Sequence, residues 1–251
     1  MSFQSILSLT LTLFLFSQSN SYGMHIMEGY LPVTWSGFWW ALYIPFFIVG
    51  VKKLKSILGE SLEKKLLVAL IGAFIFLVSA IKLPSLTGSS SHATGIALGA
   101  ILLGPSAVFV LGAIVLFFQA TLLAHGGYTT LGANSMSMAV VGAVVAYFVY
   151  SCLRKKCGEK TAIFLGATLG DLMTYVCTAI QLALAHPVDG VNYVESAIKF
   201  LGIFSITQIP LAIIEGIITV IIINMLPVDL IGETLHGTKK ADIKKEVEQH
   251  V

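Results

Sequence analysis

Apolar stretches of helical length recur along this chain, and they constrain its fold more than any other feature. Stretches 95–123, 162–185 and 195–226 hold few charged residues. Only 11% of the chain is charged and its mean hydropathy is +0.89, whereas soluble domains carry roughly 25% charged residues. The stretches also lack the alternation of apolar and polar residues that marks membrane β-strands. The sequence therefore predicts an all-α fold, a polytopic helical bundle in a membrane.

The charges and motifs exclude several classes of protein. A net charge of +2, with no basic patch interleaved with aromatic residues, does not indicate a nucleic-acid partner. There is no Gly-x4-Gly-Lys-Ser/Thr loop, and 158–161 is only a fragment of one, so the chain is not expected to bind ATP in that way. Common hydrolase signatures and a convincing inverted repeat are also missing. We therefore expect a protein that is not itself an enzyme.

The three cysteines show no paired framework. Cys152 and Cys157 flank a basic loop expected in the cytosol, where thiols stay reduced, and Cys177 lies apart from them. A Cys-x4-Cys spacing is a weak zinc signal, and we interpret all three residues as structural or incidental.

Residues 1–23 resemble a cleavable signal peptide. The apolar core, 6–16, is too short to span a membrane comfortably, and Ser21 and Gly23 are small residues at the −3 and −1 positions of a cleavage site. No Lys or Arg precedes this core, so an uncleaved N-terminal anchor is the alternative. Cleavage after Gly23 leaves a single membrane domain, 24–251.

Seven mature spans are predicted from the apolar stretches and the basic clusters between them. The basic clusters within 52–65, 154–160 and 239–245 are expected in the cytosol, which places the mature N-terminus outside and the tail, 228–251, inside. The spans are expected at about 35–51, 66–83, 95–123 (a hairpin of two short helices), 136–150, 162–185 and 195–226.

Two prolines shape these predicted spans. Pro105 is expected to begin the second helix of the hairpin, which turns at Gly104-Pro105, because the N–H that proline lacks would be unpaired there anyway. Pro210 is expected to separate an interfacial lead-in from the last span proper. Closely spaced small residues in the spans favour close helix packing, either within the chain or against a partner helix: Gly95, Gly99, Gly104, Gly112, Gly142 and Gly166.

The stretch Met24-His25-Ile26-Met27-Glu28-Gly29-Tyr30-Leu31-Pro32 becomes a metal chelator once the leader is removed. The free amine of Met24, the backbone amide nitrogen of His25 and its imidazole Nδ1 then form two fused chelate rings in one plane. Such a planar nitrogen set favours Cu(II) or Ni(II) and tolerates Co(II) better than it suits tetrahedral Zn(II). We therefore predict a metal-binding N-terminal segment, 24–34, on the outer face. Metal binding there should weaken in acid, because each ligand must lose its proton.

His92 is the expected fourth ligand, because its loop lies on the same side of the membrane as Met24. Hydroxyls at Ser90, Ser91 and Thr94 are candidates to orient its ring or the backbone of the site. A solvated loop histidine is the alternative for His92. His125, also external, is either a residue beside the metal or a loop hydrogen bonder, and we prefer the second interpretation.

Two acidic residues lie within the predicted spans. Asp171 and Glu215 are functional candidates because ionisable side chains in a membrane are costly. They are equally expected to satisfy polar neighbours such as Thr174 or Gln208.

The segment 24–32 closely resembles the mature N-terminus of the cobalt substrate-binding (S) components of energy-coupling factor transporters, the CbiM family. Three more stretches match that family: 87–95, 123–134 and Gly170-Asp171. Nickel relatives usually carry Pro-Asp-Gly after Met-His-Ile, so Met27-Glu28-Gly29 favours the cobalt branch. Many relatives begin directly at Met-His, so the leader is a departure that makes this site depend on processing.

The resemblance implies a seven-span S component of an ABC-type importer in the cell (inner) membrane that captures Co2+ on the external face and feeds cobalamin biosynthesis. It implies Met24, His25 and His92 as the ligands, and the ion as substrate rather than cofactor. Its partners would be a small accessory membrane subunit (CbiN-like), a transmembrane coupling subunit (CbiQ-like) and a cytosolic ATPase (CbiO-like). Two alternatives stay open: a nickel S component, and a membrane metalloenzyme using His92, His125 and Asp171.

Overall fold

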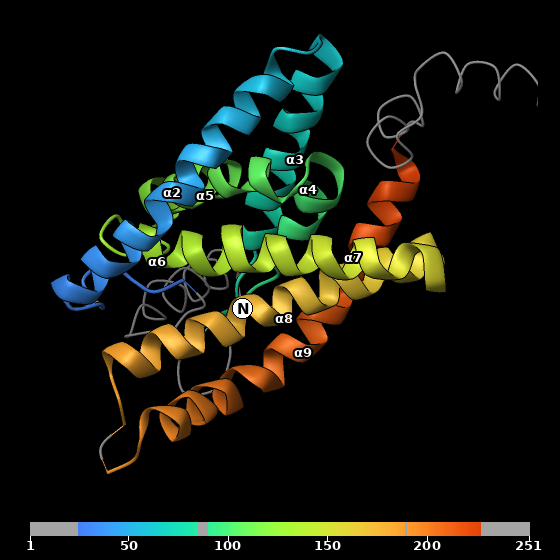
Figure 1. Cartoon of the computed structure of the whole chain (residues 1–251). Coiled ribbons are helices and arrows are strands. Elements are labelled where there is room, and N and C mark those ends of the chain that lie inside the picture. Colours follow the sequence, from blue (N-terminus) through green and yellow to red (C-terminus); the bar gives the residue numbers. More distant parts are fainter. Residues whose placement is uncertain (1–24, 85–89, 189, 227–251) are drawn as a thin grey trace, which may run out of the picture.

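The computed structural model describes residues 25–84, 90–188 and 190–226, which form a bundle of helices (Figure 1). The predicted leader, Met24 and the tail beyond 226 lie outside the described residues. The helices are α2 (Val33–Leu58), α3 (Leu62–Ala80), α4 (Ile96–Leu103), α5 (Pro105–Leu123), α6 (Leu131–Asn134), the π-helical η2 (Ser135–Gly142), α7 (Ala143–Cys157), α8 (Glu159–Ala185) and α9 (Tyr193–Met225). Two short strands, β1 (Leu83–Pro84) and β2 (Ser90–Ser91), pair antiparallel. The prediction of an all-helical fold is confirmed for the described part of the chain.

Within the described residues, four helices are long and apolar enough to cross a membrane: Pro105–Leu123, Leu131–Cys157, Glu159–Ala185 and Tyr193–Met225. The second of these joins α6, η2 and α7 into one continuous helix. The multi-helix membrane architecture is thereby supported, while the number of crossings and the side of each terminus stay predictions.

The first two helices are longer than the apolar stretches that predicted them. We expected a loop over 52–65, but α2 continues to Leu58 and α3 begins at Leu62, so the connection is only 59–61. Hydropathy marks where a chain leaves lipid and not where its helix ends, because Lys has a high helix propensity and is favourable near a helix C-terminus. The same holds for α7, whose last turn contains Arg154, Lys155 and Lys156.

The predicted turn at Gly104-Pro105 is confirmed. α4 ends at Leu103, Gly104 has φ +83°, and Pro105 is the first residue of α5. Every residue of α4 is buried. At a rise of about 1.5 Å per residue, α4 is roughly 12 Å long, which is short of a hydrocarbon core of about 30 Å. It therefore enters the bundle as a short helix surrounded by protein, the setting in which a helix end at membrane depth is tolerated.

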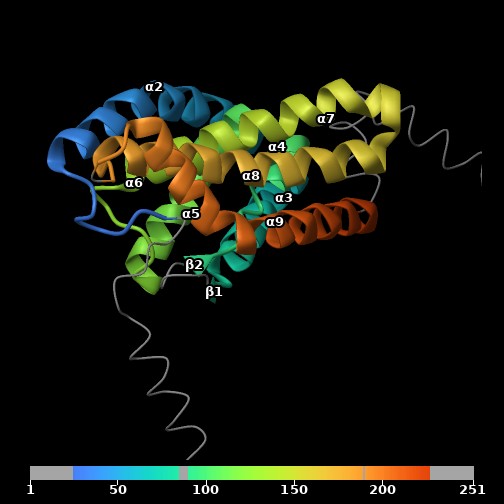
Figure 2. The same ribbon diagram turned by 90° about the horizontal axis from the view of Figure 1, so that it is seen from below.

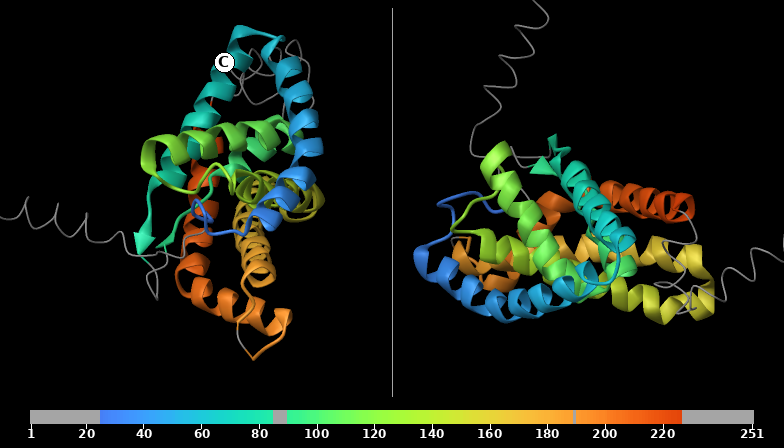
Figure 3. Two further views of the ribbon diagram at one scale, coloured as in Figure 1. Left: turned by 90° about the vertical axis from the view of Figure 1, so that its left-hand side faces the viewer. Right: turned by 90° about the horizontal axis from the view of Figure 1, so that it is seen from above.

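The last helix is continuous through Pro210, so the expected break between a lead-in and a span is wrong as a helix boundary. Figure 3 shows that α9 instead bends strongly along its length. A proline inside a helix removes one backbone hydrogen bond and kinks the helix without necessarily ending it.

The small residues pack mostly inside the chain. A Cβ added at Gly112 would lie 2.6 Å from Ala139 Cβ, and one at Gly166 would lie 2.8 Å from the Ala146 carbonyl oxygen. Gly95, Gly99 and Gly142 have similarly close neighbours, whereas Gly104 has none within 4 Å. Internal packing, one of the two interpretations of these residues, thus accounts for all but Gly104.

The two basic turns lie toward one end of the molecule. In Figure 1 the turn between α2 and α3 and the turn between α7 and α8 lie toward the top and right, whereas the start of α2 and the loop between α8 and α9 lie to the left. Whether both turns face the cytosol, as the positive-inside rule predicts, stays a prediction.

Candidate metal centre

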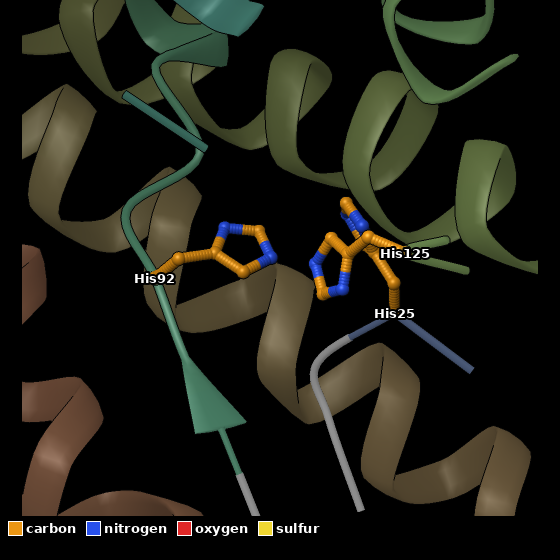
Figure 4. Close-up of side chains that lie close together, drawn as sticks. All are labelled: His25, His92 and His125. Atoms are coloured by element: carbon orange, nitrogen blue, oxygen red, sulfur yellow. The ribbon is translucent and has the colours of Figure 1, made fainter. Parts of the chain in front are cut away.

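Three histidines from separate parts of the chain meet in one buried cluster (Figure 4). His25 precedes α2, His92 lies between β2 and α4, and His125 follows α5. Their exposed fractions are 1%, 0% and 2%. The ring centroids lie 4.6 Å apart for His25 and His92, 4.5 Å for His25 and His125, and 5.1 Å for His92 and His125. One candidate donor atom from each residue lies within 4.8 Å of the other two.

The backbone beside His25 is held by the start of the helix that carries η2. The N–H of Ile26 donates to Asn134 Oδ1 at 2.8 Å, and Asn134 Nδ2 donates back to the Ile26 carbonyl at 3.1 Å. The Thr130 hydroxyl donates to the same carbonyl at 2.6 Å. These bonds fix His25 over the helix without using its own ring.

The N-terminal segment also binds the loop that carries His125, and Figure 2 shows the two running side by side. The N–H of Glu28 donates to the Gly126 carbonyl at 3.3 Å, and Thr129 donates to the Glu28 carboxylate from its hydroxyl at 2.6 Å and its N–H at 3.1 Å. Burial alone would raise the pKa of Glu28, but the Thr129 hydrogen bonds outweigh it and lower that pKa. A Cβ at Gly127 would lie 2.5 Å from the Glu28 Cα, so only glycine allows this approach.

His92 is held by α8 and α9. Its N–H donates to the Tyr175 hydroxyl, and that hydroxyl donates to the His92 carbonyl, both at 3.2 Å. The Glu215 carboxylate accepts hydrogen bonds from the Thr94 hydroxyl and N–H and from the Gly95 N–H. Because these amides lie at the start of α4, a carboxylate there also matches the helix dipole.

Two of the three hydroxyls predicted beside His92 anchor its loop, and the third residue, Ser90, contributes a backbone pairing. The Ser91 hydroxyl shares a hydrogen bond with Thr207 at 2.8 Å, the Thr94 hydroxyl donates to Glu215, and Ser90 pairs with Pro84 in the short β1–β2 pairing. Of the two roles expected for them, positioning the backbone is the one that these contacts support.

Each ring of the cluster has one nitrogen without a hydrogen-bond partner: His25 Nδ1, His92 Nε2 and His125 Nε2. The other nitrogen is engaged in two of them. His25 Nε2 lies 3.4 Å from Met138 Sδ, and His92 Nδ1 lies 2.9 Å from the Ala93 carbonyl. A carbonyl only accepts, so His92 carries its proton on Nδ1 and its lone pair on Nε2. Buried nitrogens left unpaired in one place are what a metal site without its ion presents.

The three rings are neutral at pH 7. Burial lowers the pKa of His92 to about 4, although its hydrogen bond to the Ala93 carbonyl opposes this shift. Burial and the neighbouring His92 lower the pKa of His125 to about 2. Burial, His125 and His92 hold the pKa of His25 well below its ordinary value. Neutral imidazole is the form that binds metal ions.

The cluster includes a residue that the sequence interpretation undervalued. The sequence favours a loop hydrogen bonder over a residue beside the metal for His125, and in the structure its ring lies against both other histidines. The available signal was its place on the same predicted side of the membrane as His92. Asn134, Met138 and Tyr175 were not predicted as contributors, because their roles depend on which helices lie next to one another.

Asp171 and Glu215 lie outside the histidine cluster, which alone forms a metal-ligand group within the described ranges. Asp171 Oδ2 accepts a hydrogen bond from Gln208, as one interpretation expected. Glu215 instead binds Thr94 and Gly95. Asp171 is thus not joined to His92 and His125 as the metalloenzyme alternative requires.

Comparison with known proteins gives a consistent result. The model of the CbiM family, described as the cobalt uptake substrate-specific transmembrane region, matches residues 25–228. A cobalt transport protein CbiM of Clostridioides difficile is 55% identical over 86% of this chain and 87% of its own length. One from Nostoc is 56% identical over 82% of this chain and 79% of its own length. A solved structure of a truncated transition metal transporter is 28% identical, with a TM-score of 0.69 over 80% of this chain and 96% of that one.

Proposed function

The chain belongs to the CbiM family of cobalt transport proteins, and from this premise we propose that it is the S component of an energy-coupling factor importer that captures Co2+ at the histidine cluster. The observation that carries the proposal is the set of unpaired ring nitrogens, His25 Nδ1, His92 Nε2 and His125 Nε2, in one buried place. The ion is the transported substrate and not a resident cofactor.

The proposed ligands in one plane are the Met24 amine, the His25 amide nitrogen, His25 Nδ1 and His92 Nε2. The orientation of His25 supports this set, because Nδ1 is the nitrogen that closes a six-membered ring with the residue's own amide. Its Nε2 faces Met138 and is thereby turned away from that role. Met24 acts as a ligand only if the leader is cleaved after Gly23, which forms part of the proposal.

Uphill transport requires other subunits. The sequence lacks a Gly-x4-Gly-Lys-Ser/Thr loop, and its nearest fragment, 158–161, forms the turn into α8 and its first residues. We propose that a CbiO-like ATPase supplies energy through a CbiQ-like coupling subunit, with a CbiN-like accessory subunit, and that the cobalt serves cobalamin biosynthesis. The site is proposed to face outward from the inner membrane.

The test is the metal content of the purified protein and of two variants. We expect one cobalt per chain in the natural protein and none in His25→Ala, because that change removes a ring ligand. The control is His186→Asn, which removes an imidazole that contacts Tyr30 outside the cluster and should keep the metal. Nickel in place of cobalt would favour the nickel alternative, and catalytic turnover that survives His25→Ala would favour an enzyme.

A further inference from the structure

His125 has no role in the proposed planar ligand set, although its ring is as buried as the other two. Its Nε2 has no hydrogen-bond partner. The ring contacts His25 and His92 at centroid distances of 4.5 and 5.1 Å. An unpaired polar atom in such a place is costly unless a ligand compensates it.

The distances allow all three rings to bind one ion. Nitrogens bound at about 2 Å from a metal lie roughly 3 Å apart when adjacent and roughly 4 Å apart when opposite. One candidate donor atom from each of the three rings lies within 4.8 Å of the other two. Small movements of the rings therefore suffice.

We propose that His125 Nε2 is a fifth, axial ligand to the captured ion, and that this ligand selects Co2+ over Ni2+. The inference rests on the proposed function, because it assumes that Met24, His25 and His92 fill the plane. With four nitrogens in that plane, a further donor from the same cluster lies above or below it.

The selectivity follows from the d-electron counts of the two ions. By the general affinity order, a nitrogen site prefers Ni2+ to Co2+, so geometry must reverse the preference. A planar set with a deprotonated amide makes Ni2+ (d8) low-spin, and the filled orbital along the axis then repels an axial donor. Low-spin Co2+ (d7) has one electron in that orbital and binds an axial nitrogen. A fixed axial imidazole therefore stabilises bound Co2+ and adds little stability to bound Ni2+.

The loop around His125 is held by its backbone, so the side chain can be changed without releasing the loop. The His125 N–H donates to the Gln119 carbonyl at 3.2 Å, and Gly126 accepts from Glu28. His125→Phe keeps an aromatic ring against His25 and removes the nitrogens, which makes it the variant of choice.

The deciding measurement is electron paramagnetic resonance of the full-length protein loaded with Co2+ without oxygen. An axial 14N splits each cobalt line along the axis into three, whereas 15N splits it into two. We expect three-line splitting in the natural protein and two-line splitting after labelling with [15N]histidine. His125→Phe should lose the splitting, and the control His186→Asn should keep it.

Binding titrations give a second readout on the same variants. In His125→Phe the affinity for Co2+ should fall about tenfold or more, while the affinity for Ni2+ should change less than about threefold. Splitting that survives in His125→Phe, or an equal loss for both ions, would overturn the axial assignment. A natural protein that binds no Co2+ at all would instead overturn the proposed function, so the two failures are distinguishable.

Discussion

At the residue scale, the proposed ligands differ in whether a proton must leave before the metal binds. The three histidine rings need not lose a proton, whereas the backbone nitrogens must. The pKa is about 4 for His92 and about 2 for His125, and the pKa of His25 is held well below its ordinary value. Near neutral pH each of these imidazoles therefore has an unprotonated nitrogen and need not release a proton to bind a metal. In the proposed ligand set, the Met24 amine, with an ordinary pKa of about 7.7, and the His25 amide must each lose one. The affinity should therefore rise with pH because of the backbone nitrogens alone.

This gives a proton count. At pH 6 we expect about two protons released per Co2+ bound, one from the amine and one from the amide. Three imidazoles with ordinary pKa values near 6.5 would bring the total to about four. Calorimetry in buffers of different ionisation enthalpy measures the number, and a value near four would contradict neutral rings in the apo site.

Met138 should act on the metal through His25. Its sulfur lies 3.4 Å from His25 Nε2. When Nε2 carries the ring proton it donates to this sulfur, and Nδ1 keeps the lone pair that binds the metal. We expect Met138→Leu to weaken Co2+ binding by up to about tenfold, the lower end for residues that orient a ligand, because leucine offers no acceptor. Met136→Leu, in the same π-helical stretch, is the matched control. Equal affinities in the two variants, measured by titration, would remove Met138 from the site.

At the scale of elements, α9 holds the start of α4, next to His92, through the carboxylate of Glu215. Glu215 is 1% exposed and accepts hydrogen bonds from Thr94 and Gly95 at the start of α4. Glu215→Gln replaces one acceptor oxygen with an NH2 group that faces donors. We expect about a tenfold loss of Co2+ affinity.

Two further variants distinguish positioning by Glu215 from a general loss of structure. Glu215→Asp keeps the charge and should restore part of the affinity. Glu195→Gln makes the same change at an exposed position of α9 and should bind as the natural protein does. If Glu215→Gln also leaves the titration unchanged, Glu215 does not position His92.

The helices themselves were partly predictable. The turn at Gly104-Pro105 followed from two residues with strong backbone preferences, and the apolar stretches located most of the helices. The extension of α2 to Leu58 was not predictable from hydropathy, because lysines continue a helix beyond lipid. Neither was the π-helical stretch Ser135–Gly142, a rare form that is frequent at functional sites and that here carries Met138.

At the scale of the whole molecule, the site depends on contacts between distant segments, and this limits what the sequence could show. His25 was identifiable because its chemistry is local to the chain's own backbone. His92 followed from membrane sidedness. The place of His125 against both rings depends on how the end of α5 packs against the N-terminal segment. No local sequence pattern predicts that packing.

The orientation of the bundle is open to a labelling test. Cys152 and Cys157 are exposed free cysteines, near the basic turn between α7 and α8 that we predict to lie in the cytosol. A membrane-impermeant maleimide should label them in inside-out vesicles and not in intact cells. A cysteine placed at Tyr128, which is 51% exposed in the loop after His125, should react in intact cells once Cys152 and Cys157 are replaced by serine. The reverse pattern would invert the predicted topology.

Metal capture by a processed N-terminus is the central claim, and native mass spectrometry of the purified full-length product tests it most directly. One spectrum reports both the N-terminus and the bound ion. We predict the mass of a chain that begins at Met24 plus one cobalt ion. A chain that retains residues 1–23 and carries no metal would contradict the account.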